Sequence, residues 1–241
     1  MRYFSLLFLV SSLLFILLDP PSTIAQSTGR TRLQAEIESL RNQLKAREQE
    51  FLSPTAEDQA TFAKFLAVPD TGLIRLLPRP ESDAQSRLSI RGGGAYYSFT
   101  RLTHEYGYGS DIELRNGSFS VGFVGADYGF LTVLGDIALE SVSINTPAVA
   151  FLASLKAPSR SSEARVQQRQ SSNGIEQDGT VYKRRVAAAL ANTYVLRSVN
   201  YDTSDVLVAF RVVRKDIDGS LILLWKMLRQ LPAPSLVQDE K

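Results

Sequence analysis

Three consecutive strand patterns in the last third of the chain constrain its fold more than any other feature. They cover residues 193–199, 206–214 and 221–228, and short aspartate-rich turns separate them. The middle pattern is apolar on both faces, with Val208 and Phe210 on one side and Leu207 and Ala209 on the other. Because such a strand lies inside a sheet that is covered on both sides, we expect these strands to be central and Trp225 to be in the core.

A strand pattern in residues 110–115 indicates which side chains face outward in the first half of the chain. Ile112 and Leu114 fall on one face, which we expect to be buried. The other face carries three charged residues: Asp111, Glu113 and Arg115. We interpret this charged face as the solvated side of the strand.

The next two residues, Asn116-Gly117, tolerate the positive φ angles of a two-residue hairpin turn. Residues 118–124 then place Phe119, Val121 and Phe123 on one face. Further strand patterns are expected at residues 87–91, 96–102, 130–134 and 139–144. The apolar residues 148–155 fit a short helix or a strand equally well.

These patterns add up to about nine strands in two groups, residues 87–144 and 193–228. Because hairpins join the strands, we predict a mainly β fold, with a single antiparallel β-sandwich or barrel domain in residues 87–231. Residues 157–180 are rich in serine, glutamine and arginine and have little to bury, so we expect a mobile polar loop there. Residues 232–241 are expected to form a loose tail.

Residues 1–25 have the pattern of a signal peptide. Arg2 precedes a dense apolar run, and Thr23 and Ala25 are small residues at the positions that a signal peptidase reads. The run is shorter than the roughly 20 residues that span a bilayer, so we expect cleavage after Ala25, with an uncleaved membrane anchor as the alternative.

The chain has no cysteine, which excludes disulfide scaffolds and cysteine zinc sites. We expect a secreted or periplasmic protein.

Residues 26–52 contain the clearest helix pattern. Leu33, Ile37, Leu40 and Leu44 repeat at alternating spacings of four and three residues, which is the seam of a coiled coil. This seam predicts a homo-oligomer, and an amphipathic helix folded back on its own domain is the open alternative. A second helix, capped by Ser53, and a connector are expected in residues 53–86.

The charge of the chain does not indicate nucleic-acid binding. The formal net charge is only +2 over 241 residues. Between residues 156 and 185, seven basic residues outnumber three acidic ones, but without the aromatic interleaving of nucleic-acid grooves. We interpret them as a solvated loop rather than an anion-binding patch. The run Gly92-Gly93-Gly94 lacks the flanking residues of nucleotide-binding loops, and we expect no cofactor and no metal.

The loop at residues 103–109 and its neighbours form the candidate binding site. Loops on a rigid sheet carry function more often than the sheet itself, and this loop holds the only histidine of the chain. Tyrosine offers a large contact area and a polar tip. The candidate binding residues are Tyr96, Tyr97, His104, Glu105, Tyr106, Tyr108 and Asp111.

No pattern for a nucleophile, a metal set or a phosphate loop is found in the sequence. We therefore expect an exported, non-catalytic β-rich protein that binds a ligand or assembles with a partner. A binding protein of this kind would expose its clustered tyrosines. The alternative is a glycosidase-like hydrolase that uses two carboxylates together with His104 as a base.

Overall fold

The computed structural model describes residues 22–80 and 88–237, with side chains from residue 29 onward. The fold is mainly β, with 34% of the described residues in strands and 29% in helices, and its sheets are antiparallel. The predicted signal peptide lies almost entirely outside the described residues, as do parts of the predicted connector and tail. No helix within the described ranges is both long and apolar enough to cross a membrane.

The larger sheet contains five antiparallel strands in the order β1-β11-β10-β9-β5. Their bounds are Thr71–Leu76 (β1), Tyr128–Gly135 (β5), Thr193–Asn200 (β9), Ser204–Lys215 (β10) and Leu221–Leu231 (β11). The three strands that the sequence placed at the centre are the interior strands, which confirms that prediction. The predicted start of the β domain at residue 87 is wrong, because the earlier β1 pairs with β11 along its whole length.

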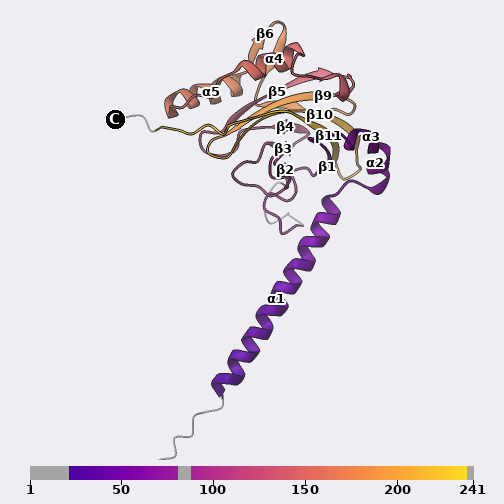
Figure 1. The fold of residues 1–241 in the computed structure, drawn as a ribbon, viewed down its shortest axis with the longest axis vertical. Coiled ribbons are helices and arrows are strands. Elements are labelled where there is room, and N and C mark those ends of the chain that lie inside the picture. The colour runs from indigo at the N-terminus through magenta and orange to yellow at the C-terminus, as the bar shows by residue number, and fades with distance from the viewer. Residues whose placement is uncertain (1–21, 81–87, 238–241) are drawn as a thin grey trace, which may run out of the picture. The chain divides into compact units, whose positions relative to one another are not determined.

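Both faces of the five-stranded sheet are buried, as the apolar pattern of β10 predicted. On one face, Phe210 packs among residues of the smaller sheet. Trp225 lies in the same core, 5% exposed, with its ring centroid 5.3 Å from that of Phe99. On the other face, Leu207 and Ala209 pack against helices. Figure 1 shows these layers on either side of β9, β10 and β11.

The smaller sheet has the order β2-β3-β4-β8. Its strands are Tyr96–Tyr97 (β2), Ile112–Arg115 (β3), Ser118–Ser120 (β4) and Arg185–Ala187 (β8). The turn between β3 and β4 is the predicted one, with φ angles of +49° at Asn116 and +66° at Gly117. A separate hairpin joins β6 (Ile175–Gln177) to β7 (Thr180–Tyr182). The predicted strand at residues 87–91 is wrong, since residues 88–91 form bends and a turn.

Helices cover the face of the five-stranded sheet that lies away from the smaller sheet (Figure 1). They are α2 (Ala56–Thr61), α3 (Ala63–Leu66), the 3₁₀ helix η2 (Leu139–Ser141), α4 (Pro147–Ser154) and α5 (Ser161–Asn173). The strand predicted at residues 139–144 is therefore replaced by η2. The open alternative at residues 148–155 is settled in favour of a helix.

The predicted mobile loop at residues 157–180 is wrong. It contains α5, β6 and the start of β7. The buried residues of α5 are Ala164 and Ser171, so the helix buries almost nothing that a hydrophobic pattern would reveal. Its attachment is instead polar, because the Ser171 hydroxyl donates a hydrogen bond to the carbonyl of Gly129 on β5.

The N-terminal helix α1 runs from Ser22 to Leu52, and the chain divides within it into two structural units, residues 1–44 and 45–241. The seam residues of the first unit are exposed, from 46% at Ile37 to 59% at Leu33. In the second unit, Leu52 is buried in the domain. The cap of α2, the helix after α1, is Thr55, which forms a capping box with Asp58, and not the predicted cap Ser53.

Candidate functional site

The smaller sheet turns one row of polar side chains away from the core. Ile112 and Leu114 are buried between the sheets, so the alternating Glu113 and Arg115 face the opposite side of β3. The strand register extends this polar face across all four strands. The row in register across the sheet is Tyr96, Glu113, Ser120 and Arg185.

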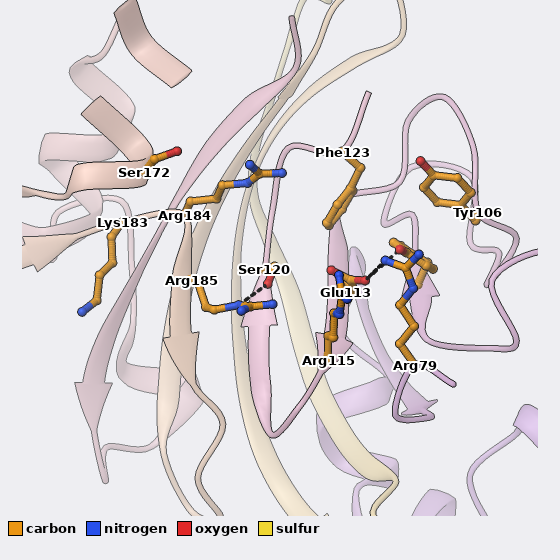
Figure 2. A pocket seen from close by; sticks show the side chains of 11 residues that line it. Arg79, Tyr106, Glu113, Arg115, Ser120, Phe123, Ser172, Lys183, Arg184 and Arg185 are labelled. Carbon is orange, nitrogen blue, oxygen red and sulfur yellow. Dashed lines mark hydrogen bonds and ion pairs between the residues drawn. The ribbon is translucent and has the colours of Figure 1, made fainter. Parts of the chain in front are cut away.

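A pocket of about 440 Å³ lies over this row, and we call it the basic pocket (Figure 2). Among its described lining residues, five are cationic and one is anionic. They come from segments far apart in the sequence, so the pocket exists only in the folded chain. The lining residues are Arg79, Tyr96, Tyr106, Glu113, Arg115, Ser120, Phe123, Ser172, Lys183, Arg184 and Arg185.

Glu113 is the acidic residue of the basic pocket and is already engaged. Its Oε1 atom accepts hydrogen bonds from the Tyr96 hydroxyl at 2.7 Å and from Nη1 of Arg79 at 2.9 Å. Burial and the Glu113 carboxylate both raise the pKa of Tyr96, so this hydroxyl remains a donor. Glu113 therefore neutralises Arg79 and leaves the other cations of the pocket unbalanced.

Arg184 and Arg185 are held in place by uncharged acceptors. Arg184 donates from Nε to the carbonyl of Val121 at 3.0 Å and from Nη2 to the carbonyl of Gly122. Arg185 donates from Nε to the Ser120 hydroxyl at 3.1 Å. In Figure 2 both guanidinium groups extend toward the β4 side of the pocket. These contacts orient the two cations without neutralising them.

Arg115 and Lys183 add two further cations. Neither they nor the two neighbouring arginines take part in an ion pair within the described part of the chain. Arg115 lies beside Glu113, and Lys183 lies at the margin of the pocket near Ser172 (Figure 2). The pocket therefore presents an excess of positive charge to whatever enters it.

Aromatic rings form the wall of the basic pocket opposite Arg184. The Tyr96 ring lies 4.5 Å from Tyr106 and 5.2 Å from Phe123, centroid to centroid. Phe123 was expected on the same face as Phe119 and Val121, and that prediction is wrong, because those two residues lie in the core and Phe123 lines the pocket. Gly122 has a φ of +72°, and a Cβ there would lie 2.8 Å from the backbone of residue 128. The chain therefore turns after β4 and carries Phe123 into the pocket.

The structure divides the sequence-predicted site residues among several places. Two of them, Tyr96 and Tyr106, line the basic pocket. Tyr108 is 70% exposed and is not among the lining residues of the basic pocket. The expectation of an exposed tyrosine cluster is wrong for β2, where Tyr96 and Tyr97 are 3% and 6% exposed. Tyr97 faces the core between the sheets, and Tyr96 is covered by its aromatic neighbours.

Tyr97, His104 and Glu105 line a different pocket of about 850 Å³, which we call the His104 pocket. His104 Nε2 donates to the carbonyl of Arg75 on β1 at 2.8 Å. Burial lowers the pKa of His104 to about 4, against the effect of that hydrogen bond. Glu48, also in this pocket, accepts hydrogen bonds from the Ser89 hydroxyl and backbone N–H. The histidine is therefore neutral near pH 7 and holds the edge of the sheet.

Asp111 is fully buried and lines neither the basic pocket nor the His104 pocket, which corrects the interpretation of its carboxylate as solvated. Its oxygens accept hydrogen bonds from the Phe99 backbone N–H and the Asn200 amide, each at 2.8 Å. Burial raises the pKa of Asp111 to about 7, and these hydrogen bonds oppose the shift. Glu113, 4% exposed, is likewise not solvated. Asp111 ties the loop after β2 to the end of β9 and has a structural role.

Sequence reasoning missed most of the basic pocket. Arg79 lay in the expected connector, and Lys183, Arg184 and Arg185 were counted as basic but assigned to a solvated segment. Within the described ranges, no cluster of three or more His, Asp or Glu side chains has a geometry that could hold a metal ion. Comparisons with known protein families, curated proteins and solved structures found no match to this chain.

Proposed function

We propose that this chain is an exported, non-catalytic binding protein that takes an anionic ligand in the basic pocket. The observation that carries the proposal is the charge of the pocket, where one engaged carboxylate accompanies five cations. Guanidinium groups present a planar fork of donors that matches carboxylate, sulfate or phosphate oxygens. A pocket of this size is in the range of small-ligand sites, which are about 300–1,000 Å³.

The lining of the pocket supports binding more than catalysis. Glu113 is the one carboxylate among its described lining residues, and both Arg79 and Tyr96 already bind it. A general acid or base needs a lone pair or proton free to reach the substrate. The pocket thus offers positive charge and hydrogen-bond donors, and its one described carboxylate is already engaged.

Binding of sucrose octasulfate, with uncharged sucrose as its control, tests this function. Calorimetric titration at low salt should show binding of the sulfated sugar only, because exposed charges attract an anion most strongly when screening is weak. Replacing Arg115 and Arg185 by glutamine should weaken it about 100-fold, which corresponds to about 2.7 kcal/mol for the two charges. Equal binding of the sulfated sugar to the double variant would refute the proposed site.

The alternative function is that of an exported hydrolase with its active site in the His104 pocket. That pocket brings together His104, Glu105 and Glu48, the residue types of a glycoside hydrolase. The lowered pKa of His104 makes it a weak base at neutral pH, and Ser89 occupies the Glu48 oxygens. Hydrolysis of chromogenic glycosides that disappears in Glu105→Gln would establish this alternative over the binding function.

We also propose that the chain self-associates through α1. Four apolar residues at coiled-coil spacing, Leu33, Ile37, Leu40 and Leu44, are each 46–59% exposed within one chain, as an intermolecular seam requires. Sedimentation should show an oligomer that becomes a monomer when residues 26–44 are deleted. The deletion ends at Leu44 because Glu48 and Leu52 are buried in the second unit. A monomeric full chain would contradict self-association.

A further inference from the structure

A second pocket, which we call the α5 pocket, adjoins the basic pocket. It measures about 470 Å³ and lies between α5 and the loop at residues 122–128. The two pockets share three lining residues, Phe123, Ser172 and Arg184. Figure 2 shows Ser172 on the helix at the margin of the basic pocket, with Arg184 between it and Phe123. The two pockets therefore meet at these three residues, and we call the pair the groove, with Arg184 at the junction.

One face of α5 lines the far end of this groove. Arg165, Gln168, Arg169 and Ser172 recur at intervals of three and four residues and share that face. Gln168 donates from Nε2 to the carbonyls of residues 125 and 127, at 2.8 and 3.0 Å. The helix is thus fixed against the loop by an amide side chain, and the two arginines on either side of it are left to face the groove.

The charge excess of the basic pocket continues along α5. Arg165 and Arg169 lie one helical turn apart, are exposed, and take part in none of the ion pairs formed by the described residues. Asp127 is the acidic group at this end, and its Oδ1 accepts a hydrogen bond from the Tyr201 backbone N–H. Cations are therefore spaced along the whole groove and are not gathered at one point.

We propose that the anionic ligand of this site is a linear acidic oligosaccharide, which occupies the basic pocket and continues along the α5 pocket. The inference rests on the proposed function and adds the class of ligand. A single small anion would use only one end of a groove whose positive charge is distributed. A chain with one carboxylate or sulfate on successive sugars matches that distribution, and guanidinium groups are well suited to bind such anions.

The polar and aromatic lining favours a sugar over a nucleic acid. Ser120, Ser172, Gln168 and Asn173 alternate with the arginines and offer hydrogen bonds to sugar hydroxyls. Single-stranded nucleic acids stack their bases on free aromatic faces. The Tyr96, Tyr106 and Phe123 rings instead pack on one another in tilted and edge-on contacts. They form an apolar wall and not a stacking platform.

Oligogalacturonates of two and six residues test this inference on the full chain, together with 5′-phosphorylated hexathymidylate of similar charge. Six residues should bind about tenfold more tightly than two, because the longer probe adds contacts with α5 to those in the basic pocket. Arg165→Gln with Arg169→Gln should abolish that gain and leave the two-residue probe unaffected. Arg30→Gln with Arg32→Gln, exposed on α1, removes the same charge outside both pockets and should change neither affinity.

Each contrary outcome is distinguishable from failure of the proposed function. If sucrose octasulfate binds at the basic pocket but the six-residue probe gains nothing over the two-residue probe, the extended groove is refuted and the anion site stands. The extended groove is also refuted if the double variant Arg165→Gln, Arg169→Gln still binds the six-residue probe more tightly than the two-residue probe. Binding of hexathymidylate as tightly as the hexagalacturonate would refute the sugar as the ligand class. Failure of every anionic probe, sucrose octasulfate included, would refute the function itself.

Discussion

Arg197 and Arg115 both lie on β-strands, but the fold treats their charges in opposite ways. Arg197, on β9, is 2% exposed. It donates to both oxygens of Asp205, at 2.8 and 3.1 Å, and to the carbonyls of Leu152 and Leu155 on and after α4. Arg115, on the outward face of β3, is exposed and has no ion-pair partner among the described residues.

This difference separates arginines that hold the structure from arginines that are available to a ligand. A buried cation is tolerated only when a counter-ion and hydrogen-bond acceptors surround it. Arg197 has both a counter-ion and hydrogen-bond acceptors, and its guanidinium group is buried away from solvent. The charges of Arg115, Arg184 and Arg185 remain unmatched at a concave surface. Substitutions should therefore affect stability in the first region and binding in the second.

The largest expected effect is that of Arg197→Met. Methionine leaves the Asp205 carboxylate buried without its counter-ion, which should lower the free energy of unfolding by about 3–5 kcal/mol. Urea denaturation measures it. Arg197→Met combined with Asp205→Leu should lose less than the single change, because no charge remains buried. A loss below about 1 kcal/mol for the single change would show that the pair is not buried as described.

His104 lies between these extremes, as a basic group with a single carbonyl partner, and its effect should depend on pH. Its folded pKa of about 4 lies below the unfolded value near 6.5. The native state therefore favours neutral His104, and this contribution is present above pH 6.5 and is lost as the pH falls toward 4. His104→Gln retains a donor for the Arg75 carbonyl and removes the titration.

We expect wild type to lose roughly 2 kcal/mol more stability than His104→Gln between pH 7 and pH 4.5. Denaturation at both pH values measures the difference. Asp111 and Asp127, whose raised pKa values of about 7 and 6 act in the opposite direction, are present in both proteins and cancel in the comparison. Parallel pH curves would mean that His104 is solvated and titrates normally.

The smallest expected change in stability is that of the double variant Arg115→Gln, Arg185→Gln. Exposed side chains without ion-pair partners contribute little, so the unfolding midpoint should correspond to a change within about 1 kcal/mol. The same protein should have lost most of its affinity for sucrose octasulfate. A large loss of stability would instead show that these arginines stabilise the fold, as Arg197 does. The distinction between the buried Arg197 site and the basic pocket would then fail.

The features that sequence predicted correctly all depend on local pattern. The two-faced apolar run of β10 indicated a central strand, and Asn116-Gly117 indicated the hairpin between β3 and β4. Alternation in residues 112–115 also placed Glu113 and Arg115 on the face opposite the core. The direction of Glu113, one of the four residues in the polar row under the basic pocket, was therefore predictable, although the burial of Glu113 by Arg79 and Tyr96 was not.

The rest of the site depends on pairings that no local pattern encodes. β8 is three residues long and joins β4 from 65 residues away in sequence, as the contact between Arg185 and Ser120 shows. The basic residues around position 184 therefore looked like a solvated loop. α5 buries only small side chains, so it showed no helical hydrophobic pattern. His104 was predicted as a site residue because it is the only histidine of the chain, but its side chain donates a hydrogen bond to the carbonyl of Arg75 at the edge of the larger sheet.

The most direct test of the central claim is a crystal structure of the chain with sucrose octasulfate bound. Sulfate oxygens should lie within hydrogen-bond distance of the guanidinium groups of Arg115 and Arg185, on the outward face of the smaller sheet. Arg184 should keep its contacts with the carbonyls of residues 121 and 122, because they orient it before the ligand arrives. A ligand bound in the His104 pocket, with the basic pocket left empty, would contradict the account.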